Sequence, residues 1–388
     1  DLRTSEGAHN AAQKLKEARS LAGLVLVIEG EPESVLSGTE DTVAFLTGFF
    51  GCLQRLMSSK TRLFCLSLMR DIATHTSEAV TGEGILGMFL AAVQEYPSML
   101  FRSVALDTRT DLKRALDVIL DTGNPIVQLF YHDQEVFSTK AVDAPLSLMS
   151  EPQLELGAGD VVVISGGAKG VTYRIARALA PFKARVVLLG RTAMDPAAAY
   201  GTLRSLSDPA EKKSDRKSDR PQDDTSRDLA ALEIARNVSR LSAMGLKASY
   251  HCCDVADPHS VTQTLDQVAK QYGRIDGIIH GAGVIRDTFM ETMTPEDFKR
   301  VVEVKLLGAW NLFRASRDRG LRFFTGLSSI VAIQGNVGQV NYCAANRSFS
   351  ALLRSFSAST EGLVSKALML PPIEGTGMAE DPEVKTLM

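Results

Sequence analysis

Short apolar runs alternate with amphipathic stretches of helical length along most of the chain, and the alternation divides into two blocks. Apolar runs typical of buried strands lie in the first block at 24–29, 62–68 and 101–106, with apolar residues at helical spacing at 42–58, 85–94 and 112–120. The block ends with strand-like runs at 125–131 and 135–139. Because only residues 132–134 separate these runs, the pattern predicts a hairpin at a sheet edge.

A stronger alternation of strands and helices begins near residue 160. Strand-like runs lie at 161–164, 186–189, 247–253, 277–280, 322–327 and 366–370, and helical segments at 171–179, 230–244, 261–272, 295–314 and 342–357. Repeated units of one strand and one helix predict an α/β fold with a Rossmann-like, doubly wound parallel sheet.

Two segments lack this periodicity. Residues 141–159 are rich in Pro, Ser, Glu and Gly, which is typical of a linker, so we expect one subdomain at 1–140 and another at 160–388. Residues 196–227 interrupt the second block and carry the sequence Lys-Ser-Asp-Arg twice in tandem. Because mixed charges with few large apolar residues bury little surface, we expect this insert to be disordered; a docking role for it stays open.

The composition excludes several classes of protein. Hydrophobic residues make up 45% of the 388 residues and charged residues 23%, and the net charge of −3 gives no basic surface for nucleic acid or anionic membranes. We expect no signal peptide, and the longest apolar stretch, 43–57, is too short to span a bilayer. The five cysteines have no metal-ligand spacing, so we expect reduced thiols, no metal site and a cytoplasmic location. The charged C-terminal segment suggests a fragment cut from a larger protein.

A glycine-rich loop lies between the first strand and the first helix of the second block. It consists of Ser165, Gly166, Gly167, Ala168, Lys169, Gly170, Val171 and Thr172. Glycine lets backbone amides approach a pyrophosphate, and the N-terminus of a helix favours its charge. Arg191 follows the next strand, where NAD-binding folds tend to place a carboxylate, and an arginine there suits the 2′-phosphate of NADPH. The alternatives are a tight structural turn and a surface arginine.

The ends of the following strands also suit a dinucleotide. We expect Asp254 to contact the adenine ring and Val255 to lie beside it. Small residues that leave room for the cofactor follow the strand at 277–280: Gly281, Ala282 and Gly283.

Four polar residues follow a pattern known from one enzyme family. Ser329 ends a strand, Tyr342 and Asn346 lie one helical turn apart, and Lys305 lies on the preceding helix. The pattern resembles the short-chain dehydrogenase/reductase (SDR) family, and more narrowly the ketoreductase domains of polyketide, fatty acid and polyunsaturated fatty acid synthases. Stand-alone members usually carry Tyr-x-x-x-Lys, whereas synthase ketoreductases carry Tyr-x-x-x-Asn with the lysine moved to the helix before the serine strand, as found here.

The resemblance covers residues from about 160 to 378 and implies a function. It implies an NADPH-dependent enzyme that reduces a β-ketoacyl thioester on an acyl carrier protein to the β-hydroxyacyl thioester, with neighbouring synthase domains as further partners. The block at 1–140 resembles the catalytically silent structural subdomain that precedes such domains, because it has no glycine-rich loop after its first strand.

The expected chemistry assigns a role to each of the four residues. Hydride delivery to a ketone builds negative charge on its oxygen, and Tyr342 would supply a proton there. A phenol titrates near pH 10, so we expect Lys305 to lower the pKa of Tyr342. We expect Ser329 to donate a hydrogen bond to the same oxygen, and Asn346 to orient Lys305 or a water molecule.

Several positions depart from the family pattern. Thr172 stands where many relatives have a third glycine. Residues 285–287 only partly match the Leu-Asp-Asp motif of one stereochemical class, while Gln334 is not the tryptophan of the opposite class, which favours a (3R)-hydroxy product. Residues 374–379 resemble the family's mobile lid. Two other functions stay open: a silent reductase-like scaffold, and a free-standing dehydrogenase for an alcohol or sugar.

Overall fold

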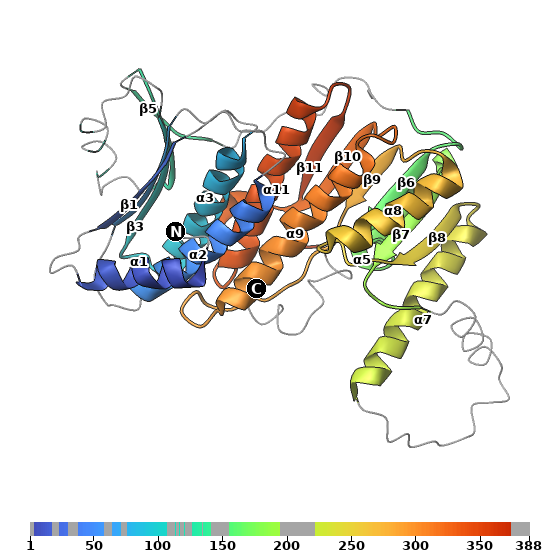
Figure 1. Cartoon of the computed structure of the whole chain (residues 1–388), viewed down its shortest axis with the longest axis horizontal. Helices are drawn as coiled ribbons and strands as arrows, with labels where there is room; N and C mark the ends of the chain where they lie inside the picture. Colours follow the sequence, from blue (N-terminus) through green and yellow to red (C-terminus); the bar gives the residue numbers. More distant parts are fainter. Residues whose placement is uncertain are drawn as a thin grey trace.

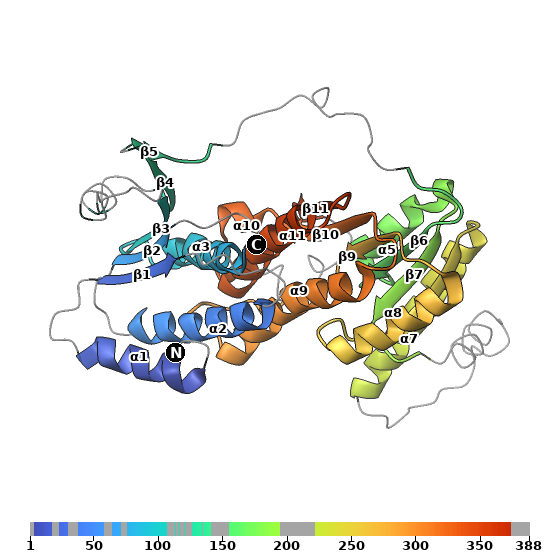
Figure 2. The ribbon, with the colours of Figure 1, turned by 45° about the horizontal axis from the view of Figure 1, so that its top comes forward.

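Two β-sheets flank a layer of long helices. The computed structural model describes residues 4–17, 23–29, 38–57, 64–70, 76–106, 113, 116, 120, 126–133, 135–140, 155–194 and 222–373. Figure 1 shows the N-terminal sheet at the left, the C-terminal sheet at the centre and right, and helices α2, α3, α9 and α11 between them. The view in Figure 2 shows the same order of layers.

The N-terminal sheet is parallel except at one edge. Its strands, in spatial order, are β1 (Gly23–Glu29), β2 (Phe64–Arg70), β3 (Leu100–Leu106), β4 (Gln128–His132) and β5 (Glu135–Phe137). Only β4 and β5 pair antiparallel, and Asp133 in the turn between them has a φ of 49°. The hairpin predicted at the sheet edge is confirmed.

The described residues of this half include the helices α1 (Ser5–Glu17), α2 (Thr39–Met57) and α3 (Ser77–Glu95). Helix α1 was not predicted, and α3 begins at Ser77 rather than at residue 85. The glycines in the first half of α3 argue against a helix locally, but tertiary packing requires them. A Cβ at Gly82 would lie 2.0 Å from the sulfur of Met69, and one at Gly84 would lie 2.3 Å from the Ser348 hydroxyl oxygen. The helix predicted at 112–120 lies almost wholly outside the described residues.

The C-terminal sheet has six parallel strands among the described residues. They are β6 (Val161–Ser165), β7 (Arg185–Gly190), β8 (Lys247–Cys252), β9 (Gly277–His280), β10 (Phe323–Ser329) and β11 (Val364–Leu370), in the spatial order β11-β10-β9-β6-β7-β8. Their helices are α5 (Gly170–Ala178), the 3₁₀ helix η3 (Ala180–Phe182), α7 (Gln222–Ala243), α8 (Pro258–Tyr272), α9 (Pro295–Ser316), α10 (Val331–Gln334) and α11 (Val340–Ser359). The strand order reverses between β6 and β9, as in doubly wound dinucleotide-binding folds. The predicted fold class is therefore confirmed.

Successive residues of the central strands serve opposite faces of this sheet. Val162 and Ile164 of β6 pack into a core with residues of α5 and α7. Val161 and Val163 pack into the larger core that contains α8, α9 and α11. This alternation explains why the central strands read as continuous apolar runs, because both faces are covered by helices.

Helix α7 begins earlier than the sequence predicted. It starts at Gln222 instead of residue 230, so residues 222–227 of the predicted disordered insert are helical. These residues include no proline or glycine. Because polar residues can sustain a helix without burying apolar surface, polarity alone does not exclude helical structure there. The part of the insert at 196–221 lies outside the described residues, as do most of the expected linker and the expected lid at 374–379.

The two halves of the chain pack through their long helices. The rings of Phe50 on α2 and Phe298 on α9 stack with centroids 4.5 Å apart. A Cβ at Gly87 on α3 would lie 2.6 Å from the carbonyl oxygen of Cys343 on α11, so these two helices meet at their backbones. None of the described helices is long and apolar enough to cross a membrane.

Candidate active site

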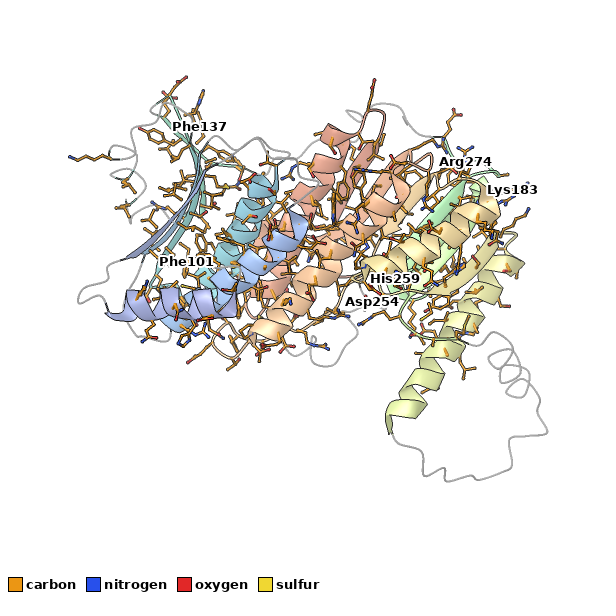
Figure 3. All side chains as sticks on the ribbon, in the orientation of Figure 1. Phe101, Phe137, Lys183, Asp254, His259 and Arg274 are labelled. Atoms are coloured by element: carbon orange, nitrogen blue, oxygen red, sulfur yellow. The ribbon has the colours of Figure 1, made fainter. Side chains whose placement is uncertain are left out.

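A cavity of about 1100 Å³ lies at the carboxyl ends of the C-terminal strands. Asp254, which follows β8, marks this edge of the sheet in Figure 3, whereas Lys183 and Arg274, which precede β7 and β9, mark the opposite edge. In doubly wound folds a ligand binds at the carboxyl edge, near the reversal in strand order. The cavity is therefore where a dinucleotide is expected in this fold.

The glycine-rich loop forms one end of the cavity. Gly166 has a φ of 69°, and a Cβ there would lie 3.1 Å from the amide nitrogen of Ala282, so glycine suits both the conformation and the close approach. Helix α5 starts at Gly170, and its N-cap residue, Lys169, makes no side-chain hydrogen bond to the first turn. The first amides of α5 thus receive no side-chain cap, which is the arrangement that suits a phosphate.

Thr172 of helix α5 packs against Gly281, which follows strand β9. The Thr172 hydroxyl donates hydrogen bonds to the carbonyl oxygens of Gly166 and Lys169, and so stabilises the loop. A Cβ at Gly281 would lie 2.0 Å from the Thr172 methyl group. Close packing of helix α5 on the strand ends is therefore retained, because the glycine lies on the facing segment.

Most of the predicted cofactor residues line the cavity. They are Gly166, Lys169, Gly170, Val171, Arg191, Asp254, Val255, Gly281, Ala282 and Gly283. Asp254 is already paired on both oxygens: Oδ1 accepts from the amide of Ala256 at 3.1 Å, and Oδ2 lies 3.3 Å from the Arg300 guanidinium. Lys169 lies 3.5 Å from Glu233 of α7. The side chain of Arg191 is exposed at the end of β7.

The other predicted loop residues lie outside this cavity. Ser165 is buried, and its hydroxyl lies 2.7 Å from Nδ1 of His280 and accepts from the amide of Ala282. Burial, with a smaller effect of the Lys305 charge, lowers the pKa of His280 to about 3, so this imidazole is neutral. A Cβ at Gly167 would lie 2.6 Å from the Ile164 side chain. Ala168 lines a neighbouring hollow beside Arg191. Ser165 and Gly167 therefore support the glycine-rich loop through contacts in the protein interior.

The predicted catalytic residues meet at the other end of the cavity. Ser329 at the end of β10, Tyr342 on α11 and Lys305 on α9 all line it. Asn346 is fully buried one turn below Tyr342, and its amide Nδ2 donates to the Tyr342 carbonyl oxygen at 2.9 Å. The spacing of these residues in the sequence thus corresponds to proximity in space.

The pKa of Tyr342 differs from the sequence-based expectation. Burial raises it to about 12, and hydrogen bonds from Asn346 and Ser329 only partly oppose this effect. Lys305, expected to lower the value, instead donates from Nζ to the Leu327 carbonyl oxygen at 2.7 Å. Its own pKa is lowered to about 8, because the side chain is 3% exposed and loses hydration. Burial thus outweighs the groups that lower the pKa of Tyr342, and the expected effect of Lys305 on the phenol stays a prediction.

Comparisons with known proteins place this arrangement in a family. A family model described as KR domain matches residues 160–374. The chain belongs to the KR domain family. A crystal structure of a ketoreductase domain from the bacillaene assembly line is similar over 95% of this chain and 87% of its own, with a TM-score of 0.69 and 23% identity. A structure of A-type ketoreductases from a modular polyketide synthase covers 98% of this chain, with a TM-score of 0.68 and 20% identity.

Curated relatives are much longer than this ketoreductase. One subunit of the polyunsaturated fatty acid synthase of Thraustochytrium sp. is 29% identical over 244 residues, which are 58% of this chain and 8% of the relative. Highly-reducing polyketide synthase 1 of Aureobasidium melanogenum is 38% identical over 146 residues, which are 37% of this chain and 6% of the relative. The chain is thus a ketoreductase domain of the type found in multidomain synthases, an oxidoreductase whose family and fold imply a nicotinamide cofactor.

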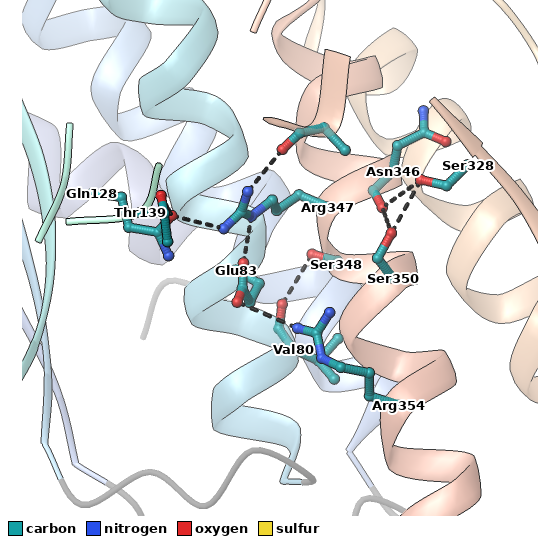
Figure 4. A network of polar contacts seen from close by, with 11 residues as sticks. Val80, Glu83, Gln128, Thr139, Ser328, Asn346, Arg347, Ser348, Ser350 and Arg354 are labelled. Atoms are coloured by element: carbon teal, nitrogen blue, oxygen red, sulfur yellow. Dashed lines mark hydrogen bonds and ion pairs between the residues drawn. The ribbon is translucent and has the colours of Figure 1, made fainter. Parts of the chain in front are cut away.

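Several contacts that sequence reasoning did not predict support the ketoreductase site. The hydroxyl of Ser328 donates to the Asn346 carbonyl oxygen at 3.2 Å, which ties β10 to α11 just below Ser329 and Tyr342 (Figure 4). Gln339, which lines the cavity, donates from Nε2 to Asp287 at 2.5 Å. Glu95, from the N-terminal half, accepts hydrogen bonds from two segments of the site. No local pattern predicts these contacts, because each contact joins distant parts of the chain.

Proposed function

We propose that this ketoreductase reduces a β-ketoacyl thioester, carried by an acyl carrier protein, to the β-hydroxyacyl thioester with NADPH. The observation that carries the proposal is one cavity with a glycine-rich loop and Arg191 at one end and Ser329, Tyr342 and Lys305 at the other. A dinucleotide is long enough to connect two such regions. The similarity to synthase ketoreductases supports a thioester substrate and neighbouring synthase domains as partners.

The residues of the loop end suit NADPH. The glycine at 166 and the uncapped first turn of α5 leave backbone amides available for the pyrophosphate. Arg191 is exposed at the strand end where it can pair with a 2′-phosphate, which NADH lacks. When bound, NADPH supplies the hydride for the ketone carbon.

The residues at the catalytic end of the cavity suit proton transfer to the ketone oxygen. Tyr342 remains protonated at neutral pH, because burial raises its pKa to about 12, so it is a phenol able to give its proton to the ketone oxygen. Ser329 donates a hydrogen bond to that oxygen as charge develops. Lys305 contributes a buried positive charge held by the Leu327 carbonyl. Asn346 is held one helical turn from Tyr342 by the hydrogen bond that its amide donates to the Tyr342 carbonyl oxygen.

A substrate comparison tests the proposal. The purified chain is mixed with NADPH and an acetoacetyl thioester of a pantetheine mimic, and oxidation of NADPH is followed by absorbance. We expect turnover of the thioester, weaker turnover with NADH, and a (3R)-hydroxy product on chiral chromatography. Preference for a free sugar or alcohol would instead support a free-standing dehydrogenase. Failure of the chain to bind NADPH would support a silent scaffold.

A further inference from the structure

Two adjoining chain segments form walls of the cavity near Tyr342. The segment 284–294 follows the small residues after β9, and the segment 335–339 leads into α11. Both contribute residues to the lining. They are joined where the amide of Thr288 donates to the Gly338 carbonyl oxygen at 2.9 Å. The relative position of these two walls therefore affects the shape of the cavity beside the proposed proton donor.

A carboxylate from the N-terminal half bridges both walls. Glu95 is the last residue of α3. Its Oε2 accepts from the amide of Met290 at 2.7 Å, and its Oε1 accepts from the amide of Gly338 at 2.9 Å. Hydrogen bonds to an ionised acceptor are the stronger kind, and a carboxylate that uses both oxygens fixes the two donors relative to each other.

Helix α3 is itself held rigidly against the catalytic half. Its backbone meets that of α11 at Gly87, beside Cys343, the residue that follows Tyr342. Nearer its end, a Cβ at Gly335 would lie 2.1 Å from the Leu90 carbonyl oxygen, and Gly335 has a φ of 70°. Glu95 is thus presented from a helix whose position along α11 and the 335–339 wall is fixed.

A second side chain of the N-terminal half holds the same wall. Gln54 on α2 donates from Nε2 to the carbonyl oxygens of Met290 at 2.9 Å and Met293 at 2.7 Å. Met290 is therefore held at its amide by α3 and at its carbonyl by α2. The segment 284–294 also carries Asp287, whose charge contributes to the raised pKa of Tyr342, so the position of this wall affects the proton donor.

We propose that Glu95 is a positioning residue for the acyl substrate, and that Gln54 assists it. The N-terminal half, which holds no part of the glycine-rich loop, thereby takes part in substrate recognition by fixing the relative position of two walls of the cavity beside Tyr342. The inference rests on the proposed function, because it concerns the thioester side of the same cavity. The glycine-rich loop and Arg191 lie at the far end and should be unaffected.

The test compares Glu95→Gln with the wild type. A glutamine keeps one acceptor oxygen but places an amide group, a donor, against the second backbone N–H. We expect KM for the acetoacetyl thioester to rise about tenfold, while kcat changes by less than about threefold and the Kd for NADPH is unchanged. The matched control is Glu83→Gln on the same helix, which faces Arg347 and Arg354 and should leave KM unchanged.

Further outcomes distinguish the two proposals. A wild-type chain that does not reduce the thioester overturns the proposed function and this inference with it. An active wild type with an unchanged KM in Glu95→Gln, or with an equal loss of NADPH binding and thioester turnover in a folded variant, overturns the inference alone. If Glu95→Gln does not fold, Gln54→Met decides: a severalfold rise in KM supports the inference, and an unchanged KM contradicts it.

Discussion

Burial controls the protonation of the two ionisable side chains at the centre of the cavity. It raises the pKa of Tyr342 to about 12 and lowers that of Lys305 to about 8. Both shifts have the same cause, because loss of hydration disfavours the charged form of either group. The phenol is therefore kept as a proton donor, while the lysine titrates close to physiological pH.

The shift of Lys305 predicts how stability depends on pH. The pKa of Lys305 is about 8 in the folded protein, against the ordinary value of 10.5. Between pH 8 and pH 10.5 the lysine is therefore protonated in the unfolded chain but largely neutral in the folded protein. Because the unfolded state binds more protons in this range, the free energy of unfolding rises with pH. Lys305→Met should therefore raise the free energy of unfolding by about 1–2 kcal/mol below pH 8, an advantage lost by pH 10.5. Urea unfolding at several pH values measures this. A variant less stable than wild type at neutral pH, or a difference independent of pH, would contradict the assignment.

Spacing in the sequence identified the residues that lie together in the site, but not their interactions. Tyr342 and Asn346 lie on one helix and Ser329 on the preceding strand end, so their proximity follows from local periodicity and from the order of a parallel sheet. The hydrogen bond from Lys305 to the Leu327 carbonyl depends on the packing of α9 against β10. No pattern in one segment predicts such a contact.

At the scale of elements, helix α3 and helix α11 are joined by an ion-pair network. Arg347 pairs with Glu83 and also donates to the carbonyl oxygen of Ala332 and to Gln128 of β4 (Figure 4). Its side chain is 13% exposed, and that of Glu83 is 20% exposed. Arg354 approaches the same carboxylate at 3.3 Å but is 54% exposed. The two arginines thus pair with the same carboxylate, but Arg347 is mostly buried and Arg354 is exposed.

This difference in depth predicts unequal effects of substitution. Arg347→Met should lower the free energy of unfolding by about 2–3 kcal/mol, because it leaves Glu83 and a carbonyl without their partly buried partner. Arg354→Met is the matched control and should cost less than about 1 kcal/mol, because water screens an exposed pair. Chemical denaturation of both variants measures the difference. Equal losses would show that burial of the network does not determine its contribution.

The sequence predicted the kind of each element better than its ends. The central strands of the C-terminal sheet are buried on both faces, so their apolar runs were unambiguous. The start of α3 was placed too late, because Gly82 and Gly84 disfavour a helix locally while packing against Met69 and Ser348 requires them. Helix boundaries of this kind depend on neighbouring elements that are distant in the chain.

At the scale of the whole molecule, the two halves share one continuous core. Residues of α2 and α3 belong to the same buried cluster as residues of α9 and α11. The stacked rings of Phe50 and Phe298 lie within it. The pattern of the sequence indicated two α/β blocks, but it contained no signal for how their surfaces meet, because such packing depends on side-chain shapes across the interface.

A shared core predicts that both halves unfold together. Trp310, the single tryptophan of the chain, lies buried on α9, and Cys65 lies buried on β2 of the other half. Trp310 fluorescence and the labelling of Cys65 by a thiol reagent, located by mass spectrometry, should give the same midpoint on heating. Labelling of Cys65 several degrees below the fluorescence transition would show instead that the N-terminal half unfolds independently.

Tyr342 is the proposed proton donor in reduction of a carrier-bound ketone by NADPH. The most direct measurement compares wild type with Tyr342→Phe, using NADPH oxidation by an acetoacetyl thioester together with the Kd for NADPH. We predict that kcat falls about a thousandfold while the Kd is unchanged, because only the hydroxyl group is removed. A Tyr342→Phe variant that keeps kcat within about threefold of wild type would contradict the account.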